Sequence, residues 1–156
     1  MAKSYAQLSR REALAAAGLC LAAIAAGGLV VPSARAATED VKAALKKYTS
    51  GAEPKLGRVT LTMAEVAENG ATVPYTVKVD SPMTEADHVK AIYILADGNT
   101  IPETAAFQLT PDCGVAEVAG RMRLAKTQNV YAIAAMSDGS FYMAKSEVKV
   151  TIGGCG

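Results

Sequence analysis

The chain has 156 residues and nearly balanced charge, with 16 basic and 15 acidic side chains, no tryptophan, one histidine and three cysteines. It contains no cluster of lysine and arginine with interleaved aromatic residues, which is the electrostatic footprint of a nucleic-acid-binding protein. No stretch resembles a Ser-His-Asp, Cys-His or paired-carboxylate catalytic arrangement either. The composition therefore argues against nucleic-acid binding, and the sequence predicts no catalytic residues of its own.

The first 36 residues have the features of an export signal. Arg10 and Arg11 lie in a basic front region, an Ala/Gly/Leu-rich run follows, and Ala34-Arg35-Ala36 fits a small-residue cleavage site. We expect residues 1–36 to be removed and the mature chain to begin at Ala37. A retained membrane anchor over residues 13–31 is the alternative, but its Ala/Gly composition and polar ending argue against it, so no membrane association is expected.

The paired arginines are typical of the twin-arginine export route, which carries folded proteins. They follow Ser9 and precede Leu14, although Ala13 stands where phenylalanine is usual and leaves the ordinary secretion route open. In either case we expect the protein to act in the periplasm.

Removal of the signal leaves about 120 residues with 12 basic and 14 acidic side chains. This length predicts one domain with a single core. Because the core would lack tryptophan and hold few aromatic residues, a second protein is expected to cover part of its apolar surface.

Residues 38–50 are predicted to form one short helix. Thr38 suits its N-cap, and Gly51 and Pro54 suit its end. Four apolar residues recur at helical spacing, which predicts a stripe that docks on the rest of the domain: Val41, Ala44, Leu45 and Tyr48.

From Gly57 onward, short runs of β-branched and aromatic residues alternate with turn residues, which predicts about seven strands. Residues 63–70 are expected to form an irregular or helical connection with Asn69-Gly70 as its turn. The predicted strands lie within residues 58–62, 72–80, 89–97, 105–109, 115–125, 129–136 and 140–152.

The turn at Ser137–Ser140 contains Asp-Gly, which favours a tight two-residue hairpin with positive φ angles. After it, Val148, Val150 and Ile152 are expected to point to the same, buried side of the final strand.

Seven short strands in an exported domain of this length predict an all-β fold, an immunoglobulin-like antiparallel β-sandwich with a short N-terminal helix. The predicted organisation is a signal over residues 1–36, a helix and linker over 37–56, a β-sandwich domain over 57–152 and a flexible arm over 153–156.

The chain ends in Gly153-Gly154-Cys155-Gly156, which places a thiol beside the terminus. Because glycine has no side chain to pin the backbone, we expect a flexible arm with a reach on the order of one nanometre. The small neighbours of Cys155 would let its thiol enter a narrow pocket of another protein. No histidine, lysine or helix start lies near it in sequence to activate it, so the thiol is interpreted as a handle on which other proteins act.

A disulfide is the competing interpretation of this cysteine. Cys20 is lost with the signal, so the mature chain holds Cys113 and Cys155, and an exported protein meets oxidising conditions. A bridge between them would tie the arm down, although a glycine-flanked terminus is an unusual anchor for one.

Other candidate sites are weak. His88 lacks neighbouring residues at metal-ligand spacing and is expected at the beginning of a strand. The methionines outside the signal are dispersed and are expected to fill the core. We therefore predict no metal and no cofactor.

Three segments together carry a resemblance to a known family: VKVTIGGCG at 148–156, AENGATVPYTVKVDSPMTEADHVKAIYI at 67–94, and RMRLAKTQNVYAIAAMSDGSF at 121–141. In this order they resemble SoxY, the sulfur-carrier family of the Sox thiosulfate-oxidation system. The similarity runs from about Gly57 to the end and includes the twin-arginine leader, but Cys113 is outside the matched motifs.

The resemblance implies a carrier that is not itself an enzyme. Pathway intermediates would be held covalently on Cys155, with Gly153, Gly154 and Gly156 forming the swinging arm. The implied partners are a SoxZ-like β-sandwich subunit in a heterodimer, a SoxAX-like c-type cytochrome, a SoxB-like dimanganese hydrolase and, as a further candidate, a SoxCD-like sulfane dehydrogenase. Two alternatives remain open, a secreted thiol oxidoreductase that uses Cys113 as its resolving cysteine and an exported interaction module with a disulfide-tethered tail.

Overall fold

The computed structural model describes residues 33–154, with side chains from Glu39 onward. The predicted signal therefore lies largely outside the described residues, and its cleavage stays a prediction. No helix in the described part of the chain has the length and apolar character needed to cross a membrane.

The described residues contain one helix, nine strands and one 3₁₀ turn, joined by loops. In chain order they are α2 (Ser33–Tyr48), β1 (Lys55–Leu56), β2 (Val59–Met63), β3 (Val66–Asn69), β4 (Val73–Val79), β5 (Val89–Ala96), β6 (Glu103–Gln108), η1 (Pro111–Cys113), β7 (Ala116–Met122), β8 (Gln128–Met136) and β9 (Phe141–Ile152).

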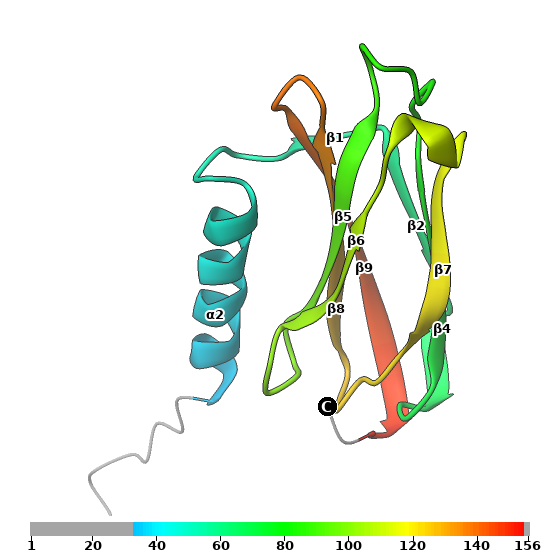
Figure 1. The fold of residues 1–156 in the computed structure, drawn as a ribbon. Helices are drawn as coiled ribbons and strands as arrows, with labels where there is room; N and C mark the ends of the chain where they lie inside the picture. The colour runs from blue at the N-terminus through cyan, green and yellow to red at the C-terminus, as the bar shows by residue number, and fades with distance from the viewer. Residues whose placement is uncertain (1–32, 155–156) are drawn as a thin grey trace, which may run out of the picture. The chain divides into compact units, whose positions relative to one another are not determined.

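The strands form two sheets that face each other (Figure 1). The larger has the order β1-β9-β8-β5-β6, with β3 also paired to β9, and the smaller has the order β2-β4-β7. All pairs are antiparallel except those of β1 and β3 with β9. The predicted all-β class, with antiparallel sheets and an N-terminal helix, is confirmed, whereas the immunoglobulin-like detail stays a prediction.

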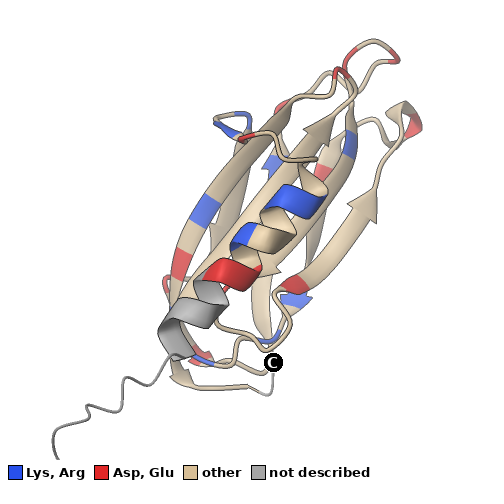
Figure 2. Cartoon of the chain, turned by 90° about the vertical axis from the view of Figure 1, so that its left-hand side faces the viewer, with Lys and Arg blue, Asp and Glu red and all other residues tan. Residues whose placement is uncertain are grey.

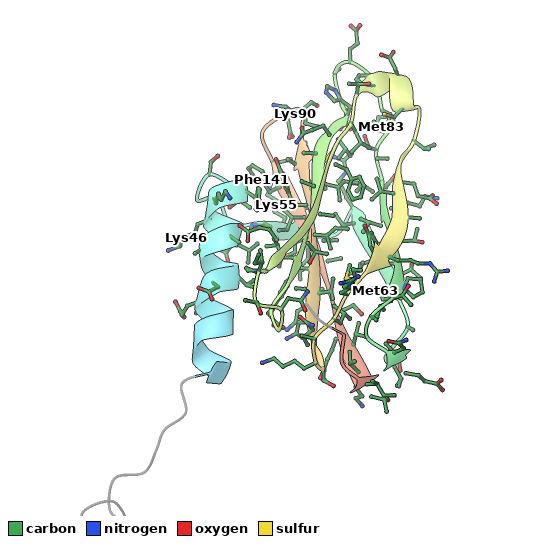
Figure 3. All side chains as sticks on the ribbon, turned by 60° about the horizontal axis from the view of Figure 1, so that its bottom comes forward. Lys46, Lys55, Met63, Met83, Lys90 and Phe141 are labelled. Atoms are coloured by element: carbon green, nitrogen blue, oxygen red, sulfur yellow. The ribbon has the colours of Figure 1, made fainter. Side chains whose placement is uncertain are left out.

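The main core lies between the sheets. In β4 the burial alternates residue by residue, as expected for a strand with one face on the core. In β5 and β8 burial is nearly continuous, because the small sheet covers one face and α2 covers the other. Methionines fill this core as predicted: Met83, Met122 and Met136 are buried, and Figure 3 shows Met63 and Met83 far apart along the sandwich.

Helix α2 covers the outer face of β5 and β8. Val41 and Ala44 are buried there against Leu95 and Ile133. The predicted apolar stripe is thus confirmed. The charged residues of α2 from Glu39 onward are all exposed, and Figure 2 marks them in colour on the ribbon of the helix. Figure 3 shows Lys46 pointing away from the sheet.

The ends of this helix differ in part from the prediction. The helix begins at Ser33, so Thr38 lies inside it and is not its N-cap. The reason is the alanine-rich segment before Thr38, since alanine has the highest helix propensity. The helix ends at Tyr48, and Gly51, with φ of 82°, donates its amide to the Lys46 carbonyl at 2.9 Å, a glycine-dependent ending as expected.

Residues 63–70 were predicted to be irregular or helical, and this is wrong for five of the eight, since Met63 ends β2 and four more residues form a strand of their own. Val66–Asn69 form β3, which pairs in parallel with the end of β9. The segment has little strand propensity of its own, so its conformation is imposed by backbone pairing with the longer strand. The predicted turn does follow it, with the Asn69 side chain accepting the Ala71 amide at 2.9 Å.

The hairpin before β9 forms, but not as a loop with two positive φ angles. Only Gly139 has positive φ, at 83°, while the Asp138 carboxylate accepts the Ser140 amide at 2.8 Å and hydroxyl at 2.6 Å. These hydrogen bonds lower the pKa of Asp138. Asp138 therefore fixes the turn through its side chain, and only Gly139 takes a positive φ angle.

The predicted burial of one side of the final strand is confirmed for two of its three residues. Val148 is fully buried and Val150 is partly buried, as predicted, but Ile152 is 67% exposed. The alternation fails there because Ile152 is the last residue of β9, where its side chain is no longer covered by the core.

Helix docking can be tested with Val41→Ala. The loss of buried methyl groups, partly offset by the better helix propensity of alanine, should lower the free energy of unfolding by about 1 kcal/mol in chemical denaturation. Lys46→Ala, on the exposed side of the same helix, should change it by less than about 0.5 kcal/mol. Equal effects would contradict docking through this stripe.

Candidate functional site

The longest strand carries the chain toward its C-terminal tail. On one edge β9 pairs with β8, and on the other with β1 near its start and β3 near its end. It ends at the lower end of the sandwich in Figure 1, where its ribbon is red. We call Ile152–Gly154 the tail root. Because strands pair with β9 on both edges, the position of the tail root is set by the larger sheet.

Two main-chain hydrogen bonds hold the tail root against two turns, and a third joins the turns to each other. Gly70 donates its amide to the Ile152 carbonyl at 2.7 Å, and its own carbonyl accepts the Leu124 amide at 2.8 Å. The Leu124 carbonyl in turn accepts the Gly154 amide at 2.9 Å. The β3–β4 turn, the β7–β8 loop and the tail root therefore meet in one backbone junction.

The junction admits no side chain at its three glycines. A Cβ on Gly70 would collide with the Leu124 carbonyl oxygen, and one on Gly153 with the Ala125 carbonyl oxygen. A Cβ on Gly154 would lie 2.6 Å from the Gly70 carbonyl oxygen. These glycines thus permit close approach of backbone to backbone.

The structure differs here from the expectation of an unpacked arm over residues 153–156. Gly153 and Gly154 touch neighbouring backbone, and Gly154 is hydrogen-bonded. Cys155 and Gly156, the predicted cargo residue and its neighbour, lie outside the described residues. The sequence could not reveal the packing, because a glycine needed for contact and a glycine needed for mobility look the same in one chain.

Charges at the junction are exposed and of both signs. Glu68 lies two residues before Gly70, while Arg123 and Lys126 flank Leu124-Ala125. None of the ion pairs found within residues 39–154 involves these three side chains. Because exposed charges are screened by salt, main-chain contacts rather than charge set the geometry of this site.

The remaining candidate residues lie elsewhere. His88 immediately precedes β5, as expected, with its Nδ1 atom 3.0 Å from the Thr84 carbonyl oxygen and its amide donating to Ser137 Oγ at 3.1 Å. Within residues 39–154, no group of three or more His, Cys, Asp or Glu side chains could hold a metal ion.

Cys113 is exposed and lies in η1, at the opposite end of the sandwich from the tail root (Figure 1). Between Cys113 and Leu124 runs β7, whose seven residues span about 20 Å. Cys155 is one peptide link from Gly154, so their Cα atoms are about 3.8 Å apart. A disulfide needs Cα atoms within about 7 Å. The described positions of Cys113 and Gly154 therefore argue against a bridge between Cys113 and Cys155, which itself lies outside the described residues.

Comparison with known proteins identifies the family. The sequence matches the family model described as "Sulfur oxidation protein SoxY" over residues 41–155. The sulfur carrier protein SoxY from Chlorobium limicola f thiosulfatophilum is a similar solved structure, with 33% identity, a TM-score of 0.61, and coverage of 74% of this chain and 99% of that one. No curated protein matches.

Two superoxide reductases show the fold alone. Neelaredoxin from Ignicoccus hospitalis has 19% identity and a TM-score of 0.53, covering 60% of this chain and 80% of that one. A putative superoxide reductase from Thermotoga maritima has 15% identity and a TM-score of 0.50, covering 66% and 89%.

The geometry predicts that oxidation yields no internal bridge. After treatment of the folded protein with a thiol oxidant, non-reducing peptide mapping should find disulfides only between molecules. The matched control is Cys113→Ser, which should remove only those links that involve residue 113. A two-hydrogen loss from the monomer that disappears in Cys113→Ser would contradict the assigned separation.

Proposed function

The chain belongs to the SoxY family of sulfur oxidation proteins, and on that premise we propose that Cys155 holds thiosulfate-derived sulfur covalently in the periplasm while partner enzymes act on it. Family membership supports a sulfur-carrier role and places the chain in the Sox system with a SoxZ partner. The residue, the compartment and the enzymes are the parts that we propose.

The observation that carries the proposal is the position of the tail root. The Gly154 amide is hydrogen-bonded to the Leu124 carbonyl at one end of the sandwich, and Cys155 is the next residue in the sequence. Cys113, the other cysteine of the mature chain, lies too far from the tail root to form a disulfide with Cys155 or to take over its cargo. Cargo on Cys155 would thus be presented at one end of the domain, apart from other thiols of the same chain.

The proposed chemistry begins with an oxidative coupling. The Cys155 thiolate and thiosulfate form a new sulfur–sulfur bond, giving Cys–S–S–SO₃⁻, and two electrons pass to a SoxAX-like c-type cytochrome. Water then cleaves the bond to the sulfonate group on a SoxB-like dimanganese hydrolase, which releases sulfate and two protons and leaves Cys–S–S⁻. A SoxCD-like dehydrogenase is the candidate for oxidising the remaining sulfane.

In this scheme the chain binds and presents but does not catalyse. Covalent attachment keeps a reactive sulfane from diffusing away, and it raises the local concentration of the cargo at each enzyme to which the carrier docks. A thiol with no activating neighbour in its own sequence suits this role, because each partner supplies the chemistry.

A SoxZ-like subunit in a heterodimer fits the surface of the described residues. Strand β6 is an edge of the larger sheet, and β2 and β7 are the edges of the smaller one. Open edges favour pairing with another chain unless they are covered. Several large apolar side chains are also exposed and would gain from a partner: Leu56, Val66, Ile101, Val115 and Ile152.

The cargo assignment is tested by Cys155→Ser. With thiosulfate and the Sox partner proteins, intact-mass analysis of the unaltered protein should show a thiosulfonate adduct on residue 155, and the variant should show none and support no thiosulfate oxidation. Its stability and SoxZ binding should be unchanged, since serine has nearly the size of cysteine and removes only the sulfur chemistry.

The matched control is Cys113→Ser, which removes the other thiol of the mature chain and should leave loading intact. Loading that persists in Cys155→Ser and disappears in Cys113→Ser would overturn the assignment.

A further inference from the structure

One asparagine side chain spans the loop that holds the tail root. The Nδ2 atom of Asn99 donates to the Arg123 carbonyl at 2.9 Å, and its Oδ1 accepts the Ala125 amide at 3.0 Å. These two partners lie on either side of Leu124, whose carbonyl accepts the Gly154 amide. Asn99 is suited to this because its amide offers a donor and an acceptor at once.

Asn99 is itself held in place by the side chain of Gln128. Its Oδ1 also accepts Gln128 Nε2 at 2.9 Å, and Gln128 Oε1 accepts the Gly98 amide at 2.6 Å. Gln128 is only 4% exposed, and a Cβ on Gly98 would lie 2.8 Å from its side chain. A closed set of satisfied hydrogen bonds of this kind rigidifies its members.

The turn that carries Asn99 is also tied to strand β8. Asp97 accepts the Asn129 amide at 2.8 Å and Asn129 Nδ2 at 2.8 Å, and the Tyr131 hydroxyl donates to it at 3.3 Å. Burial and the neighbouring Asp97 carboxylate raise the pKa of Tyr131, so its hydroxyl keeps the proton that it donates. The β5–β6 turn is therefore a fixed support.

The β7–β8 loop grips the end of the chain at a second point. Thr127 Oγ1 accepts the Val150 amide at 3.0 Å, within β9. Together with the bond from Gly154 to Leu124, this places one loop along the last residues before Cys155.

We propose that Asn99 is a positioning residue for the carrier tail: by bracing the Arg123–Ala125 segment, it holds the Leu124 carbonyl where the Gly154 amide binds and so fixes where the arm begins. This rests on the proposed function of Cys155. Asn99 touches neither the thiol nor any cargo, and it acts through Leu124.

Fixing the root at Gly154 shortens the arm. With the root held, the Cα atom of Cys155 stays about 3.8 Å from that of Gly154. With the root released back to Ile152, three links allow a reach of about 11 Å. The volume open to the thiol then grows by roughly an order of magnitude, and its effective concentration at a docked active site falls accordingly.

The first test measures the brace without any cargo. In Asn99→Ala of the full chain, amide hydrogen exchange followed by NMR should be about tenfold faster or more at Gly154, since a lost hydrogen bond is worth about that factor. The core amide of Ile133 should be unaffected. Thr100→Ala, an exposed neighbour, is the control and should change neither.

The second test measures positioning. The kcat/KM for loading by the SoxAX-like partner should fall by roughly tenfold in Asn99→Ala, while the rate at which iodoacetamide alkylates Cys155 should not fall. A general structural defect would not separate the two rates in this way. Because the exchange measurement needs no cargo, it stands even if Cys155 proves never to be loaded.

Unchanged exchange at Gly154 in folded Asn99→Ala would overturn the brace, and faster exchange with unchanged kcat/KM would overturn its positioning role. If exchange at Ile133 also accelerates, Asn99→Asp replaces Asn99→Ala in both measurements and is judged by the same outcomes. This variant keeps the acceptor for Ala125 and Gln128, and it replaces the donor to the Arg123 carbonyl by a negatively charged oxygen that cannot donate.

Discussion

The structure at the carrier end depends on one backbone junction, in which Gly70, Leu124 and Gly154 approach so closely that none of the glycines could carry a side chain. Backbone amides and carbonyls must find partners when they are shielded from water. Here three segments that are distant in sequence form hydrogen bonds with one another. The tail root, which precedes the cysteine, takes part in two of these hydrogen bonds.

This junction gives a physical reason for the length of β9. The strand is twelve residues long, and it connects the hairpin at one end of the sandwich with the tail root at the other. Its pairing with β8 lies inside the larger sheet, while the short parallel strands β1 and β3 complete its other edge. The tail root thus inherits the rigidity of the sheet, and its two glycines are packed although their composition alone predicts a mobile segment.

In the proposed function, the fixed tail root and the distance of Cys113 from it both help to keep Cys155 available to partner enzymes. A carrier must present one thiol to several enzymes, and it must not lose that thiol to a bridge within its own chain. In this fold β7 separates Cys113 from Leu124, the hydrogen-bond partner of Gly154, by distance rather than by chemistry. The position of the tail root and its separation from Cys113 therefore both follow from the sandwich.

Residue patterns in the sequence were sufficient for the all-β class, the helix stripe and the family. Alternation in β4 and the spacing of Val41 and Ala44 report local periodicity, which a single chain displays directly. The tertiary structure alone decided that Val66–Asn69 is a strand, that Gly153 and Gly154 are packed, and that Asn99 supports Leu124. Each of these depends on contacts between residues far apart in sequence, and glycine or asparagine in isolation does not reveal which distant backbone it will meet.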